Sequence, residues 1–235
     1  MNHFLLNLAL AVLPVVLAIT LHEIAHGYAA LALGDTTARD AGRLSLNPVR
    51  HIDTVGTILL PGFLLISQLL VPPHKVFFMF GWAKPVPVAA WKFRHPRQQM
   101  ALVAIAGPLM NFFLAWIAAV LMPAPQIPTQ ATELIQQFLI YFMLSNLVLG
   151  LFNLVPVPPL DGGRIAVGIL PLSLARVWAR LERAGILIVL LVVFILPRMI
   201  GVDPVGEALN HVLPWAFRTV FWLAGQDVTA WDNTI

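Results

Sequence analysis

Long apolar runs alternate with short polar connections along the chain, and they predict helices that cross or enter a membrane. The first run covers residues 4–33. A helix of about 30 residues spans about 45 Å, more than a hydrocarbon core of about 30 Å, so its C-terminal third should approach one membrane face. Further runs cover residues 55–71, 100–122, 134–155 and 185–196, and the last is shorter than a comfortable span.

The composition supports a polytopic membrane protein and excludes an ordinary soluble domain. Hydrophobic residues make up 59% of the 235 residues and charged residues 11%, whereas soluble domains have about 25% charged residues. No repeat or low-complexity tract separates a second domain. We therefore expect one membrane-embedded domain over residues 1–235, with a catalytic core at about 4–170 and C-terminal helices at 171–235. The chain has no cysteine, which excludes disulfides and thiolate metal ligands.

A stretch with two prolines between the second and third runs predicts extended backbone. In residues 81–88, Pro85 and Pro87 occupy alternate positions, which favours an edge strand or hairpin over a helix. The expected fold class is therefore all-α and polytopic, with about five to six transmembrane or re-entrant helical segments and a small extended hairpin. We expect the hairpin to lie near the active site.

Positive charges cluster in three of the connections and predict the topology. The chain has 14 Lys and Arg against 11 Asp and Glu, and the cations gather at residues 39–50, 75–97 and 164–183, whereas residues 123–131 carry none. By the positive-inside rule the first run crosses inward, the third outward and the fourth inward, which leaves the N-terminus outside. The charge pattern indicates topology rather than affinity for nucleic acid.

The second run, at residues 55–71, breaks this parity because it has cations on both sides. It cannot cross once without placing a basic loop outside. We predict that it is re-entrant or pairs with a second short element at about 77–82.

Residues 205–224 have an amphipathic pattern. Glu207, His211, Pro214 and Arg218 fall within a narrow arc at 3.6 residues per turn, and apolar side chains lie mostly elsewhere. An interfacial helix is the favoured interpretation, and a sixth transmembrane helix is the alternative.

Three ionisable side chains interrupt the first run in the sequence His22-Glu23-Ile24-Ala25-His26. Two imidazoles four residues apart lie on one helix face and can share a Zn²⁺ ion, and the glutamate can act as general base. Without partners, each ionisable group would cost roughly 2.5 kcal/mol or more near the bilayer centre, so a functional site is the expected explanation. The alternative is a hydrogen-bonded polar cluster between helices.

A third metal ligand is expected from a carboxylate, because catalytic zinc usually has three protein ligands and an open position. Asp161 follows the fourth run, after a stretch with three prolines and before Gly162 and Gly163. Non-helical backbone at membrane depth is tolerated where it is buried in protein or lines a watery cavity, so this break marks a site. We predict Asp161 as the third ligand; a helix N-cap is the alternative, and the two roles are compatible.

Three stretches together resemble the site-2 protease family of intramembrane metalloproteases, in its compact bacterial branch. They are residues 22–26, residues 106–111 with the sequence AGPLMN, and residues 153–164, which in this family carry the aspartate ligand. The resemblance covers roughly residues 14–169. It implies zinc on His22, His26 and Asp161, base catalysis by Glu23, and a substrate-orienting or supporting role for Asn153 and Asn111.

The resemblance also implies an activity and a location. The activity is hydrolysis of peptide bonds in or near transmembrane segments of membrane proteins, after trimming by an upstream site-1-type protease. The location is the lipid bilayer of the bacterial inner membrane, with the active site toward the cytoplasm, which agrees with the length of the first run and the placement of cations. Neither a PDZ-like insertion nor a cystathionine-β-synthase-like tail is recognisable, so we expect regulation through partners or lipids.

Two other functions fit the pattern less completely. A zinc carrier or sensor would bind a passing ion through intramembrane His and Asp, but it needs no glutamate beside the first histidine and usually has repeated halves. A proteolytically inactive scaffold would not retain all four catalytic positions. His51 and Asp53 lie together in a loop, where ordinary hydrogen bonding is the favoured explanation, and we leave both out of the metal shell.

Overall fold

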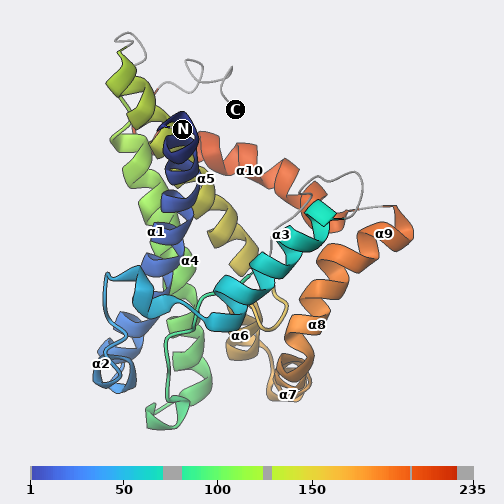
Figure 1. The fold of residues 1–235 in the computed structure, drawn as a ribbon. Coiled ribbons are helices and arrows are strands. Elements are labelled where there is room, and N and C mark those ends of the chain that lie inside the picture. Colours follow the sequence, from blue (N-terminus) through green and yellow to red (C-terminus); the bar gives the residue numbers. More distant parts are fainter. Residues whose placement is uncertain (1, 71–80, 124–128, 202, 227–235) are drawn as a thin grey trace.

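Three long helices form the centre of the molecule (Figure 1). They are α1 (Asn2–Ala32), α4 (Pro96–Val120) and α5 (Gln130–Asn153), and each is long and apolar enough to cross a membrane. Their positions agree with the first, third and fourth apolar runs, so the chain is an all-helical membrane protein. The computed structural model describes residues 2–70, 81–123, 129–201 and 203–226.

Small residues on α4 allow its neighbours to approach closely. α4 contacts α1, α5 and α6 (Asp161–Ile169), and its buried positions include Ala104, Gly107, Ala115 and Ala118. Close packing of small residues is a main source of helix association in lipid, where burial of apolar surface gives little driving force. Large apolar side chains on the same helix point outward instead, as expected of a surface that faces lipid; they include Leu102, Leu109 and Phe113.

The chain breaks between α5 and α6. Loop residues 154–160 contain three prolines and lead directly into Asp161, the first residue of α6. Pro171 then separates α6 from α7 (Leu172–Leu181). These two short helices lie at the end of the bundle where α1 ends and α4 begins (Figure 1).

The second apolar run is a short helical segment. Asp53 caps a π-helical turn at Thr54–Leu59, which continues into α3 (Leu60–Leu70). The apolar stretch Thr54–Leu70 is shorter than the three candidate spans. Most of the companion element predicted at about 77–82 lies outside the described residues.

Residues 81–89 are not helical, and the N–H groups of Trp82, Lys84 and Val86 are bonded at alternate positions, but the hairpin is not confirmed. No β-strand occurs in the described part of the chain. Residues 71–80, which would supply the other arm of a hairpin, lie outside that part. The segment 81–89 is called the edge segment below.

The C-terminal region contributes helices beyond the three candidate spans. Helix runs from Gly185 to Ile200 as α8 (Gly185–Leu190), a π-helical turn and α9 (Leu196–Ile200), and α10 (Pro204–Leu223) then returns to pack on α4 and α5. Residues Ala216, Phe217, Val220 and Phe221 form that contact. The polar arc of α10 predicted from the sequence is exposed, and α10 does not qualify as a span, so the predicted total of five to six spans is not confirmed.

A buried carboxylate ties the edge segment to the end of α1. Asp35 is fully buried and accepts hydrogen bonds from the backbone N–H of Ala89 at 2.6 Å and from the backbone and hydroxyl of Thr37, and it pairs with Lys92 Nζ at 3.2 Å. Burial alone would raise the pKa of Asp35, but these donors lower it from about 3.8 to about 2. The ionised form of Asp35 therefore stabilises the fold.

We expect Asp35→Asn to lower the thermal stability of the detergent-solubilised protein at pH 7. Because the pKa of Asp35 is lower in the folded state, its contribution is present above about pH 4 and is lost as the pH falls toward about 2. The difference in melting temperature between variant and wild type should therefore shrink over that interval. Asp40→Asn, the same change at an exposed carboxylate, serves as control; an equal loss in both variants would contradict the assignment.

Candidate metal centre

Three side chains from two helices converge on one buried point. His22 and His26 lie one turn apart on α1, with their Nε2 atoms 3.0 Å apart. Asp161, at the start of α6, places Oδ2 3.2 Å from each Nε2. All three side chains are buried. The structure thus brings together the three residues predicted from sequence as metal ligands.

The proton positions on the two imidazoles follow from their outer hydrogen bonds. His26 Nδ1 lies 2.7 Å from the backbone oxygen of Val103, and a carbonyl oxygen can only accept, so Nδ1 carries the proton. His22 Nδ1 lies 2.6 Å from Asn111 Oδ1. With both protons on Nδ1, each Nε2 presents a lone pair toward Asp161.

A relay of amides fixes the orientation of Asn111. The backbone oxygen of Phe142 accepts from Asn146 Nδ2 at 2.8 Å, so Asn146 Oδ1 faces Asn111 and accepts from its Nδ2 at 2.8 Å. Asn111 must then present Oδ1 to His22. Both asparagines are 0% exposed. The carbonyl of Phe142 thereby fixes, through the two amides, the proton of His22 on Nδ1 and leaves Nε2 with its lone pair.

This arrangement fits a bound cation. Two imidazole lone pairs and a carboxylate oxygen face one another without a proton between them, and Asp161 Oδ2 has no hydrogen-bond donor. A tetrahedral zinc site with bonds of about 2.0–2.1 Å separates its ligand atoms by about 3.3 Å. The observed separations of 3.0 and 3.2 Å are close to this value. Two imidazoles and one carboxylate are also a ligand set that suits zinc.

Glycines let neighbouring backbone approach the centre. A Cβ atom on Gly107 would lie 2.5 Å from ring atoms of both His22 and His26, so α4 can pack against the imidazoles only with glycine at this position. A Cβ atom on Gly162 would lie 2.3 Å from the backbone oxygen of Leu154. Gly107 thus lets α4 approach the imidazoles, and Gly162 lets the loop before Asp161 fold tightly against the start of α6.

Glu23 contacts the edge segment. Its Oε2 accepts a hydrogen bond from the backbone N–H of Val86 at 2.9 Å. This contact places the edge segment beside the residue that follows the first histidine, as the sequence predicts. The carboxylate of Glu23 is half-buried, and its Oε1 remains available to accept a proton.

The other predicted polar residues lie in different surroundings. Asn111 contacts His22 directly, whereas the amide of Asn153 donates to Leu149 of its own helix at 3.0 Å. His51 is buried, and its Nε2 lies 2.9 Å from the backbone oxygen of Ser45. Asp53 caps the turn at Thr54–Leu59. Of these four residues, only Asn111 touches a member of the ligand group.

Asn146 was not predicted from the sequence as part of the site. A polar residue within the apolar run 134–155 is a signal, since buried amides in a membrane span require partners. Its partner could not be identified from sequence, because Asn111 lies on a different helix.

Comparison with known proteins identifies similar chains. The family model described as "Peptidase family M50" matches residues 122–196, which include Asp161. A Bacillus subtilis protein named "Putative zinc metalloprotease YwhC" is 42% identical over 79% of this chain and 80% of that protein. Proteins named "Putative zinc metalloprotease Rip2" from Mycolicibacterium smegmatis and Mycobacterium tuberculosis are 27% and 28% identical, each over 88% of this chain and 69% of that protein. No solved structure matches the chain.

We expect Asn111→Leu to weaken zinc binding about 10- to 100-fold, as is typical when a hydrogen-bond partner of a metal-ligating histidine is lost. Leucine keeps the size of the side chain but leaves His22 Nδ1–H without an acceptor in an apolar bundle. Competition with a chromogenic chelator measures the affinity. Gln137→Ala, which removes an amide bonded to Tyr141 on α5, serves as control and should bind zinc like wild type. Equal affinity in wild type and Asn111→Leu would refute the role of Asn111.

Proposed function

Because this chain belongs to peptidase family M50, the site-2 protease family of zinc metalloproteases, we propose that it hydrolyses peptide bonds in or near transmembrane segments of membrane proteins. The observation that carries the proposal is the convergence of His22, His26 and Asp161 inside a bundle of membrane-spanning helices, with Glu23 beside them. A metal centre in this position serves a substrate that is itself in the bilayer.

The ligand residues have distinct tasks in this proposal. His22 and His26 would hold zinc through Nε2, and Asp161 through Oδ2. When bound, zinc supplies a Lewis acid that polarises a carbonyl and lowers the pKa of water. Glu23 accepts a proton on Oε1 from the attacking water and passes it to the leaving amine, while the N–H of Val86 holds Oε2 in place.

The distribution of cations supports an active site toward the cytoplasm. His22 and His26 lie in the C-terminal third of α1, and Arg39 and Arg43 follow at that end. The cations before α4 and those of α7 lie at the same end of the bundle (Figure 1). By the positive-inside rule that end faces the cytoplasm, which for a bacterial protein places the chain in the inner membrane.

A substrate helix must unwind before cleavage, because its carbonyl groups are occupied by internal hydrogen bonds. We infer that the edge segment holds the unwound chain by strand addition. Its inner side is already bonded to the protein: Trp82 N–H to Gly56, Lys84 N–H to His51, and Val86 N–H to Glu23. Successive residues of an extended chain point to opposite sides, so Ala83 presents its N–H and C=O outward.

Ala83 also opens onto a cavity that could receive substrate side chains. The cavity has a volume of about 760 Å³ and is lined by one face of α1, by residues between Pro48 and Pro61, and by Gly81, Trp82 and Ala83. It extends along α1 to Thr20, two residues before His22. Glu23 follows Ile19 by four residues and Thr20 by three, so an apolar chain paired with Ala83 would lie on the face of α1 that carries the proposed general base. We also propose, on the family resemblance, that an upstream site-1-type protease trims the substrate first.

The role assignments can be tested with the full chain in detergent and a model transmembrane substrate. Glu23→Gln should keep about one zinc per chain and lose cleavage by at least about 100-fold, as expected for a general base. Asp161→Ala should lose both zinc and cleavage. Glu133→Gln, at an exposed carboxylate in the first turn of α5, serves as control and should keep both. Wild type that retains zinc but cleaves nothing would favour the carrier or sensor.

Strand addition predicts a specific effect of Ala83→Pro. Proline removes the outward N–H but fits an extended backbone, so kcat/KM should fall about 3- to 10-fold, the equivalent of about 0.5–1.5 kcal/mol for one hydrogen bond. Zinc content should not change. Ala83→Ser keeps the N–H and should cleave like wild type. Unchanged cleavage by Ala83→Pro would rule out pairing at this position.

A further inference from the structure

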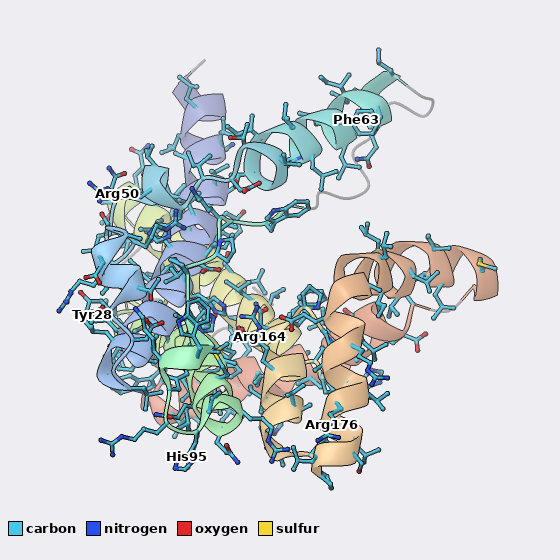
Figure 2. The ribbon with its side chains drawn as sticks, turned by 90° about the horizontal axis from the view of Figure 1, so that it is seen from below. Tyr28, Arg50, Phe63, His95, Arg164 and Arg176 are labelled. Atoms are coloured by element: carbon cyan, nitrogen blue, oxygen red, sulfur yellow. The ribbon has the colours of Figure 1, made fainter. Side chains whose placement is uncertain are left out.

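Helix α7 lies across the bundle rather than along it. It is seen end-on in Figure 1, where the spans run vertically, and side-on in Figure 2, which is turned by 90°. It lies at the end of the bundle where α1 ends and α4 begins. A short helix in this orientation runs parallel to a membrane surface.

The side chains of α7 divide into three arcs. At about 100° per residue, Leu174, Val177 and Leu181 fall within about 60° of one another, and Arg176 and Arg180 fall within about 40°. Ala175 occupies the third arc and is buried. Leu174 and Val177 are 53% and 55% exposed, although they are large and apolar. One arc therefore packs on the protein, and the apolar and cationic arcs remain uncovered.

The cations of this helix lack acidic partners within the described residues. The ion pairs there that involve lysine or arginine are Arg39–Asp40, Lys92–Asp35 and Arg164–Glu182. The nearby carboxylate of Glu182 is thus already engaged by Arg164, and Arg176 and Arg180 are exposed without a counter-charge. Figure 2 shows Arg176 on α7, near the edge of the molecule in that view.

We propose that α7 is an interfacial helix that binds anionic phospholipid headgroups through Arg176 and Arg180. Leu174, Val177 and Leu181 enter the acyl region below the headgroups, which explains their exposure. Adjacent apolar and cationic arcs are the pattern of helices that lie in a membrane interface, and the phosphate charge complements the two guanidinium groups. The bilayer is the occupant because the chain already spans it.

The position of α7 gives this headgroup site a connection to the metal centre. Trp178 Nε1–H donates to the backbone oxygen of Pro156 at 3.1 Å. Pro156 belongs to the loop 154–160 that leads into Asp161. Arg97 on α4 donates to Leu170 at 2.9 Å and holds the junction between α6 and α7. The hydrogen bond from Trp178 to Pro156 therefore links the helix proposed to bind lipid to the loop that leads into Asp161.

Lipid binding by the full chain in detergent tests the proposal. Bound phosphatidylglycerol is counted by native mass spectrometry in a titration, with phosphatidylcholine as the neutral probe. Each arginine near a lipid surface contributes about fivefold in affinity, the equivalent of about 1 kcal/mol, so Arg176→Gln/Arg180→Gln should bind phosphatidylglycerol about 25-fold more weakly. Binding of phosphatidylcholine should not change. Zinc content shows that each variant is folded.

Two further variants separate charge from structure. Arg176→Lys/Arg180→Lys keeps both charges and should retain binding of phosphatidylglycerol. Arg39→Gln removes an exposed cation that is paired with Asp40 and should also bind like wild type. Equal binding of phosphatidylglycerol by wild type and the glutamine double variant would overturn the proposal, as would an equal loss of binding in Arg39→Gln. None of these readouts depends on proteolysis, so the proposed activity can fail while the lipid site stands.

Discussion

The architecture depends on the placement of three electron-pair donors at one point inside an apolar bundle. Every polar group at this depth needs a partner, because lipid supplies none. The inner atoms of His22, His26 and Asp161 face one another in an arrangement that could hold a metal ion, and the Nδ1–H groups of the two histidines need acceptors from the protein. α4 supplies those acceptors through the Val103 carbonyl and the Asn111 amide. The close packing of α4 on α1 and the break before α6 both follow from this requirement.

A second set of buried polar groups positions the edge segment. Arg43 is buried and donates to the backbone oxygens of Arg50 and Lys84, and Asp35 binds the N–H of Ala89. Backbone outside helices and sheets needs such partners for its N–H and C=O groups. These contacts fix the segment in place, and within the described residues the N–H of Ala83 has no bonded partner. The segment can therefore act as a fixed edge rather than as a loop.

Much of the site could be predicted from sequence, because its chemistry depends on rare residues in an apolar background. His22 and His26 are four residues apart, a spacing that places both imidazoles on one face of a helix. Asp161 follows a stretch of prolines and precedes two glycines, where a helix must break. The relay could not be predicted, since Asn146 contacts Asn111 across two helices and the relay ends on a backbone carbonyl, which has no sequence signature. The number of spans was also beyond the sequence, because apolar runs such as 55–71 and 185–196 do not show whether they cross.

Glu23 links the metal centre to the edge segment. Its Oε2 accepts from the N–H of Val86, so the residue proposed as general base is held by the segment that is proposed to bind substrate. Ala83 lies three residues away, about 10 Å along an extended chain. A strand paired at Ala83 would therefore run past Glu23 within a few residues of the contact. Under the proposed function, movement of the edge segment would displace both Glu23 and the substrate, so the backbone amide of Val86 would couple substrate binding to proton transfer.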